Sequence, residues 1–244
     1  MDLHASTWTD ADAAGTDLAL LPVGSTEQHG PHDPLGTDYL AAEMVARETA
    51  ERTETEVVVA PSVPVGISEE HRQFTGTLWV SPNTFRSYVR EVAESLLHHG
   101  WNRIVLVNGH GGNVPALGEV AANLARHHDA VVVPFTWFDA VEASFEMGHA
   151  GPVETSFLLH TRPELVHEDR FEAARDGGMD RWGEWVAGLN LAHDAAEFTE
   201  NGTVGDPTEA TAEEGERLLE GAVTALDALL EAIAERPVKQ PPHR

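Results

Sequence analysis

The chain has 244 residues, 41% of them hydrophobic, which is enough for one larger α/β domain or for two small ones. It carries 41 acidic residues against 15 basic ones, a formal net charge of −26, which excludes a broad basic surface for nucleic acid or an anionic membrane. The absence of cysteine excludes disulfides, thiolate metal ligands and a cysteine nucleophile.

Apolar runs and turn signals alternate along the chain and predict alternating strands and helices. Short, continuous apolar runs suit strands buried on both faces and are found at 18–23, 56–60, 102–107 and 131–135. Helical spacing or capping signals predict helices starting at Thr37 and Ser81, and others around 117–124, from 153 onward and over 209–235. This order predicts a mostly parallel sheet with helices on both faces.

Other segments lack a clear period. Residues 1–16 are expected to be a surface lead-in, and the long irregular segment 61–77 is expected to be functional, as such connections usually are. We expect 162–208 to cover the site or contact another subunit rather than to form a second domain. The prediction is one domain over 1–235 and a disordered tail, rich in proline, over 236–244.

Composition also predicts the cellular environment of the protein. Lys239 is the only lysine, and an acidic excess with arginine in place of lysine suits concentrated salt, so we expect a halophilic cytoplasm. An acidic surface for a partner protein is the alternative. The N-terminal residues lack the pattern of a signal peptide, and no apolar run reaches the roughly 18 residues of a membrane span. We therefore predict a cytoplasmic protein without nucleic-acid or membrane partners.

Candidate metal ligands follow three of the predicted strands. Carboxylates and imidazoles are ligands that divalent metals take from proteins, and the carboxyl ends of parallel strands meet at one edge of a sheet. In an extended segment, side chains two residues apart, such as those of Glu27 and His29, point to the same side and can reach one point in space. The candidates, in chain order, are Glu27, His29, Asp38, His110, His149 and Glu154. The alternative for the first three is a polar loop that leads into a helix with Thr37 as its N-cap.

Several other site types fit less well. The glycines around His110 could cradle a phosphate, but the Gly-Lys-Ser/Thr ending of a phosphate loop is missing. The chain has no Gly-x-Ser-x-Gly and no His-Glu-x-x-His, which argues against serine hydrolases and the common zinc proteases. Of the remaining histidines, His32 and His71 lie in loops near the site and could support its ligands. The others, at 4, 98, 99, 127, 128, 160, 167, 193 and 243, are assigned to the surface or to structural roles.

Four motifs, in this order, resemble those of the creatininase (creatinine amidohydrolase) family. They are Glu27-Gln28-His29-Gly30-Pro31-His32, Thr37-Asp38, Asn108-Gly109-His110-Gly111-Gly112-Asn113 and Gly148-His149-Ala150-Gly151-Pro152-Val153-Glu154-Thr155-Ser156. The resemblance implies a three-layer α/β/α fold and hydrolysis of a non-peptide amide C–N bond. It also implies two divalent metal ions, zinc and/or manganese with iron possible, and a homo-oligomer such as a hexamer built from dimers.

The resemblance also implies roles for individual residues. Glu27 would bind one metal and His29 the other, with Asp38 bridging both and His110 as a further ligand. Creatininase has a glutamate where this chain has Gly112, so Glu154 is expected to supply the missing oxygen ligand in the catalytic centre. His149 corresponds to the histidine that handles the proton.

The substrate follows less directly. Creatinine enzymes contact their substrate through a tyrosine and a Trp-Asp pair, and this chain has Gly111 and Phe145-Glu146 at those places. The leading expectation is a creatinine- or creatine-like cyclic amide. Alternatives are a formamide deformylase acting on a formylaminopyrimidine ribonucleotide in archaeal flavin or deazaflavin biosynthesis, a peptidase that trims a modified peptide cofactor, and a non-catalytic metal-binding assembly protein. His149 favours an enzyme, because a closed structural site needs no proton donor.

Overall fold

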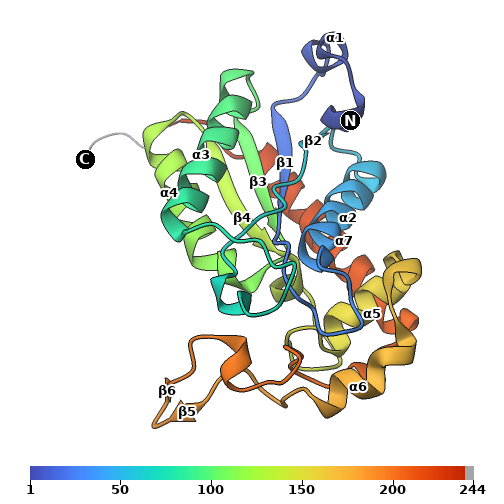
Figure 1. Ribbon diagram of the computed structural model, residues 1–244. Helices are drawn as coiled ribbons and strands as arrows, with labels where there is room; N and C mark the ends of the chain where they lie inside the picture. The colour runs from blue at the N-terminus through green and yellow to red at the C-terminus, as the bar shows by residue number, and fades with distance from the viewer. Residues whose placement is uncertain (240–244) are drawn as a thin grey trace.

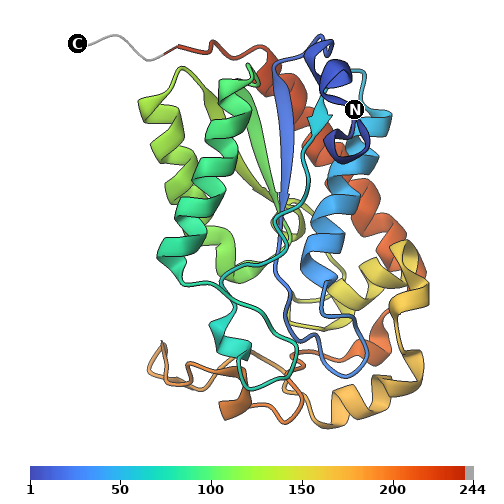
Figure 2. The same ribbon diagram turned by 45° about the horizontal axis from the view of Figure 1, so that its top comes forward.

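The computed structural model describes residues 1–239, in which a parallel sheet separates two layers of helices (Figures 1 and 2). The sheet has the order β2-β1-β3-β4. Its strands are β1 (Leu18–Val23), β2 (Val58–Val59), β3 (Arg103–Asn108) and β4 (Val131–Thr136). The helices are α1 (Trp8–Asp12), α2 (Thr37–Arg52), α3 (Pro82–His98), α4 (Val114–His127), α5 (Pro152–Thr161), α6 (Phe171–Asp176) and α7 (Ala212–Ala234). Figure 2 shows α3 and α4 on one face and α2 and α7 on the other.

The three layers follow from the alternation of side chains along buried strands. Leu18 and Leu20 of β1 pack into a core with α2, α5 and α7, whereas Ala19 and Leu21 pack into a second core with α3 and α4. Both faces are apolar, as a parallel sheet covered on each side requires. The predicted three-layer α/β/α fold with a parallel sheet is therefore confirmed.

The observed bounds refine the predicted elements. The strand expected at 56–60 contains only Val58–Val59, paired with Ala19 and Leu20 at the edge of the sheet. Helix α2 starts at Thr37 as predicted. Gly36, and not Thr37 as in the alternative, takes the N-cap position, and the Thr37 hydroxyl donates to the Pro34 carbonyl oxygen at 2.8 Å. Helix α3 starts as predicted, because the Ser81 hydroxyl caps the Thr84 backbone nitrogen.

The strand order opens a crevice where the candidate residues lie. The chain moves from β1 to β2 on one side and later reaches β3 on the other, so the carboxyl ends of β1 and β3 flank a switch point. A Cβ at Gly24 would lie 2.3 Å from the Tyr39 nitrogen, and one at Gly109 would lie 2.1 Å from the Asp38 carbonyl oxygen. These two glycines therefore allow the start of α2 to carry Asp38 to the ends of both strands.

Residues 171–205, called the cover below, extend beneath the carboxyl ends of the strands (Figure 1). The cover contains α6 and a small antiparallel hairpin of β5 (Trp185–Val186) and β6 (Leu189–Asn190). Residues 240–244 of the predicted tail lie outside the described residues, and the single domain over 1–235 stays a prediction. None of the described helices has the length and apolar character needed to cross a membrane.

Candidate metal centre

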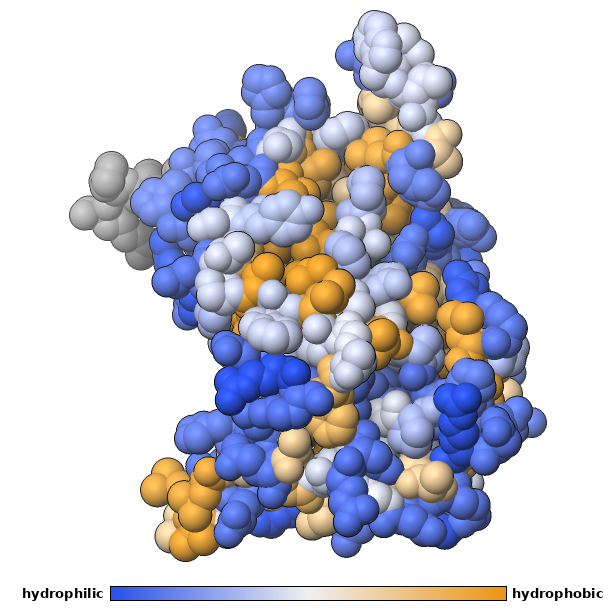
Figure 3. Space-filling model, in the orientation of Figure 1, coloured by the Kyte–Doolittle hydropathy of each residue, from blue (hydrophilic) through white to orange (hydrophobic). Residues whose placement is uncertain are grey.

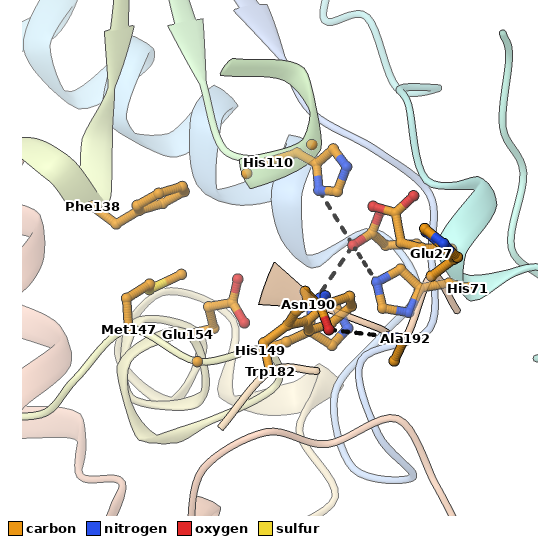
Figure 4. Close-up of a pocket in the computed structure, with 15 residues that line it drawn as sticks. Glu27, His71, His110, Phe138, Met147, His149, Glu154, Trp182, Asn190 and Ala192 are labelled. Atoms are coloured by element: carbon orange, nitrogen blue, oxygen red, sulfur yellow. Dashed lines mark hydrogen bonds and ion pairs between the residues drawn. The ribbon is translucent and has the colours of Figure 1, made fainter. Parts of the chain in front are cut away.

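A cavity of about 490 Å³ lies between the strand ends and the cover. Its lining includes four of the predicted site residues together with Phe138, Met147 and Trp182. Figure 4 shows one oxygen of the Glu27 carboxylate at the meeting point of dashed lines to His71, His110 and His149. The lining residues are Glu27, Glu70, His71, His110, Gly111, Gly112, Phe138, Met147, Gly148, His149, Glu154, Trp182, Asn190, Ala192 and His193.

The first cluster that could hold a metal ion consists of Glu27, Asp38 and His110. His110 Nδ1 lies 3.3 Å from Glu27 Oε1 and 3.2 Å from Asp38 Oδ2. All three residues are buried, and they come from the loop after β1, the first turn of α2 and the loop after β3. Two carboxylates and an imidazole are a donor set that suits zinc, manganese or iron.

The second cluster contains His29, His149 and Glu154. His29 Nε2 lies 3.8 Å from Glu154 Oε1 and 3.1 Å from Asp38 Oδ1. The Ala150 backbone N–H donates to Glu154 Oε2 at 2.6 Å, which leaves Oε1 to face His29. Asp38 thus presents one oxygen to each cluster. Glu27 and His29, expected from their spacing to reach one point, fall into different clusters.

Three imidazoles share one hydrogen-bonding pattern. His29 Nδ1 lies 3.2 Å from the Glu27 carbonyl oxygen, His110 Nε2 lies 2.6 Å from that of Ile67, and His149 Nε2 lies 2.7 Å from that of Gln28. A carbonyl oxygen only accepts, so in each neutral ring this nitrogen carries the hydrogen. The other nitrogen then turns its lone pair towards the carboxylates, as metal-binding histidines do.

The electrostatics of the clusters favour positive charge. Burial has the largest effect on the pKa of His29 and of His110 and acts to lower it, but neighbouring carboxylates outweigh it. Asp38 and Glu154 raise the pKa of His29 well above its usual value, and Glu27 and Asp38 do the same for His110. Burial acts to raise the pKa of Asp38, yet His29 and His110 together hold it below its usual range.

Hydrogen bonding leaves several atoms at the clusters unsatisfied. Both carboxylate oxygens of Glu27, His29 Nε2 and Asp38 Oδ2 are buried and make no hydrogen bond within the described residues. Buried polar atoms without partners are rare and costly, and ions or water commonly explain them. Because these atoms converge on the same small space, the residues fit divalent cations.

Gly112, where the resemblance implies that an oxygen ligand is missing, is closely surrounded. A Cβ at Gly112 would lie 2.4 Å from the Ile67 carbonyl oxygen and 2.5 Å from His110 Nε2. No side chain fits there without displacing the His110 ring. Among the ion pairs of the described residues, Glu154 supplies the only carboxylate besides that of Asp38 that faces His29.

Two further histidines line the cavity: His71, which was expected near the site, and His193, which the sequence interpretation missed. His71 is buried, with Nε2 3.5 Å from Glu27 Oε1 and its ring stacked on His149 at 4.3 Å between centroids. His193, assigned from the sequence to the surface or a structural role, lines the cavity from the cover. His32, the other histidine expected near the site, lies behind it, with Nε2 3.0 Å from the Thr155 hydroxyl oxygen. The irregular segment around 61–77, expected to be functional, was the available signal for His71.

The cover closes one side of the cavity and exposes apolar residues on its outer side. Trp182 lies edge-on to His71 and His149, at 5.4 and 6.0 Å between centroids. The hairpin tip exposes Trp185 and Leu189, with 46% and 69% of their surfaces accessible, and Figure 3 shows apolar colour at this tip. The expectation that 162–208 includes a cover over the site agrees with this arrangement.

Comparison with known proteins gives a consistent result. The family model described as "Creatininase: Creatinine amidohydrolase" matches residues 4–230. A mycofactocin precursor peptide peptidase from Mycolicibacterium smegmatis is 41% identical over 82% of this chain and 79% of its own. A creatinine amidohydrolase from Pseudomonas putida is 28% identical over 92% of this chain and 94% of its own. A solved creatininase variant described as "Zn-Zn type" has 26% identity and a TM-score of 0.77, covering 96% of this chain and 98% of that one.

Proposed function

Because the chain belongs to the creatininase family, we propose that it is a metal-dependent amidohydrolase that cleaves an amide bond in a peptide. The observation that supports this proposal is the 41% identity to a mycofactocin precursor peptide peptidase, compared with 28% identity to a creatinine amidohydrolase. This supports the peptide-trimming alternative over the leading expectation of a creatinine-like cyclic amide. The bond cleaved would then be a peptide bond rather than the non-peptide amide expected from the sequence.

The size of the cavity supports a substrate larger than a single small ring. Its volume of about 490 Å³ lies within the roughly 300–1,000 Å³ of pockets that bind drug-sized ligands. Phe138, Met147 and Trp182 supply apolar and aromatic surface, while Asn190 supplies an amide. Apolar walls with a few polar groups are what a side chain and backbone of a peptide end require.

We assign the two ions to the two clusters. Glu27 and His110 would hold one ion, and His29 and Glu154 the other, with Asp38 bridging both. The positions of Asp38 Oδ1 and Oδ2, 3.1 Å from His29 and 3.2 Å from His110, support the shared role. Bound divalent cations would supply Lewis acidity and a water of lowered pKa.

His149 is the residue we assign to proton transfer. Burial and the neighbouring His29 lower the pKa of His149, which keeps its ring neutral at the start of a reaction. Its Nε2–H donates to the Gln28 carbonyl oxygen at 2.7 Å, so the free lone pair is on Nδ1. Nδ1 would take a proton from the attacking water and pass it to the departing nitrogen, which is otherwise a poor leaving group. Trp182 would exclude bulk water from this transfer.

The test compares substrates on one zinc-loaded sample. The protein is incubated with mycofactocin precursor peptide, creatinine and a formylated aminopyrimidine, and products are identified by mass spectrometry. Matched samples are stripped with a chelator and then reloaded. We expect cleavage of the peptide alone, lost on stripping and restored by metal. Hydrolysis of creatinine or of the formamide without cleavage of the peptide would overturn the proposal.

The expected homo-oligomer, the identity of the metals and the cytoplasmic, halophilic setting stay predictions. A non-catalytic assembly role would be supported by a fully metal-loaded protein that cleaves none of the three substrates.

A further inference from the structure

One imidazole beside Glu27 departs from the pattern of the others. His29, His110 and His149 each place one ring nitrogen against a backbone carbonyl oxygen, which can only accept a hydrogen bond. His71 instead places Nδ1 2.8 Å from the side-chain Nε2 of Gln28. Which of these two nitrogens donates decides what His71 presents to the cavity.

The orientation of the Gln28 amide is fixed by its neighbours. The Gly30 backbone N–H donates to Gln28 Oε1 at 2.9 Å, so that atom is the oxygen. Gln28 Nε2 lies 3.2 Å from the Gly202 carbonyl oxygen, which must accept. The amide is also confined, since a Cβ at Gly202 would lie 2.1 Å from Gln28 Oε1. The nitrogen of the amide therefore faces His71, with a hydrogen left to donate.

His149 Nε2 also lies 2.9 Å from Gln28 Nε2, but its shorter contact is with the Gln28 carbonyl oxygen at 2.7 Å. The carbonyl satisfies the His149 N–H, and the two amide hydrogens of Gln28 serve Gly202 and His71. His71 Nδ1 is then the acceptor, and in a neutral ring the hydrogen is on Nε2. The Nε2 nitrogen that carries it lies 3.5 Å from Glu27 Oε1, which is an ion-pair separation and not a hydrogen bond.

We infer that Gln28 holds His71 as an N–H donor towards Glu27, so that His71 is a positioning residue and not a metal ligand. The distances alone would allow Glu27, His71 and His149 to hold an ion of their own. The hydrogen on Nε2 removes that possibility and instead orients the Glu27 carboxylate on its own cluster. This inference rests on the proposed metal centre but not on the identity of the substrate.

The chemistry of the neighbours is consistent with a neutral His71. Burial, together with the adjacent His149, lowers the pKa of His71. The two rings stack with an angle of 20° between their planes, at 4.3 Å between centroids. The two nearly parallel rings face the same Glu27 oxygen in different ways. His71 turns an N–H towards it, whereas His149 turns the lone pair of Nδ1, which lies 3.7 Å from that oxygen.

The experiment is long-range ¹H–¹⁵N NMR of protein labelled with ¹⁵N-histidine, first stripped of metal and then titrated with zinc. His71 is assigned from the resonances lost in His71→Gln. We expect a hydrogen on Nε2 and a lone pair on Nδ1 of His71 before zinc and after it, while the resonances of His29 and His110 change. The wild-type measurement is informative even if Gln28→Glu does not fold.

A matched pair of variants tests the part played by the amide. Gln28→Glu keeps the shape and still accepts from the Gly30 N–H, but it cannot donate to His71 Nδ1. We expect Nδ1 of His71 to gain a hydrogen and zinc binding to weaken by about 10- to 100-fold, as for other groups that orient ligands. Thr77→Val is the control, because Thr77 accepts only from the Gln28 backbone N–H, at 3.1 Å. It should leave the tautomer and zinc binding unchanged.

The outcomes separate this inference from the proposed function. Loss of the Nε2 hydrogen of His71 on zinc binding, with His29 and His110 also changed, would make His71 a ligand and overturn the inference alone. Zinc that changes none of these histidines would instead overturn the metal centre. An unchanged His71 tautomer in folded Gln28→Glu would refute the role of the amide.

Discussion

Replacing Asp38 by asparagine tests whether one carboxylate serves both clusters. Asp38 Oδ1 lies 3.1 Å from His29 Nε2 and Oδ2 lies 3.2 Å from His110 Nδ1. At about 3 Å and an effective dielectric constant of about 20, two unit charges interact by roughly 5 kcal/mol. Removing one partner of a buried pair costs about 3–5 kcal/mol. Since each 1.4 kcal/mol changes a binding constant tenfold, Asp38→Asn should weaken the binding of both ions by roughly a hundred- to a few thousand-fold.

The assay is calorimetric titration with zinc, paired with elemental analysis of the protein after dialysis against buffered zinc. Asp33→Asn is the matched control, because Asp33 is also a buried carboxyl, in the loop that precedes α2, but accepts from the Thr155 hydroxyl at 2.7 Å and belongs to neither cluster. The control should bind two ions with normal affinity. If Asp38→Asn loses one ion and keeps the other at full strength, Asp38 does not bridge.

Three further predictions concern the proton-transfer residue, a glycine and a buried carboxyl. His149→Ala should still bind two ions but lose about 10²- to 10⁴-fold in peptide cleavage, and normal turnover would remove His149 from the mechanism. Gly112→Ala should weaken zinc binding by about 10- to 100-fold, because its methyl would lie 2.4 Å from the Ile67 carbonyl oxygen, whereas the Cβ in Gly111→Ala meets no atom within 4 Å; equal zinc titrations of the two variants would contradict this. Burial raises the pKa of Asp33 to about 7. The contribution of Asp33 to the free energy of unfolding is therefore fully present below about pH 4, and up to about 4 kcal/mol of it is lost as pH rises towards 7. Urea unfolding of the metal-free protein should show the free energy of unfolding falling as pH rises over this range, and Asp33→Asn should flatten this dependence. Equal slopes for the wild type and the variant would refute the raised pKa of Asp33.

The sheet could be predicted because its strands carry their own signal. β1 and β3 are continuous apolar runs that need two covered faces, and each ends in a motif of glycine and polar residues. Those endings also revealed the candidate ligands, since topology requires parallel strands to end on one edge. The range predicted for β2 was too long, because Val57 continues the apolar run although only Val58–Val59 pair with β1.

A cover over the site was expected, but its internal structure could not be predicted, because that structure depends on contacts distant in sequence. Trp182 packs against rings of His71 and His149, and Gly202 is held by the Gln28 amide, so no local period reveals either residue. His71 itself follows no strand. Its place beside Glu27 depends on the irregular segment after β2, whose path only the assembled molecule defines.

The charge of the site couples metal binding to the release of protons. Glu27, Asp38 and Glu154 bring three buried carboxylates together, and their attraction raises the pKa of His29 and His110 against the effect of burial. Without metal, protons on these two rings supply the positive charge. A ligand imidazole must be neutral, so cations displace those protons, and binding weakens in acid. Two divalent cations would bring four positive charges against three carboxylates. The remaining positive charge would favour a negative oxygen at the same point, which is what hydrolysis of an amide develops.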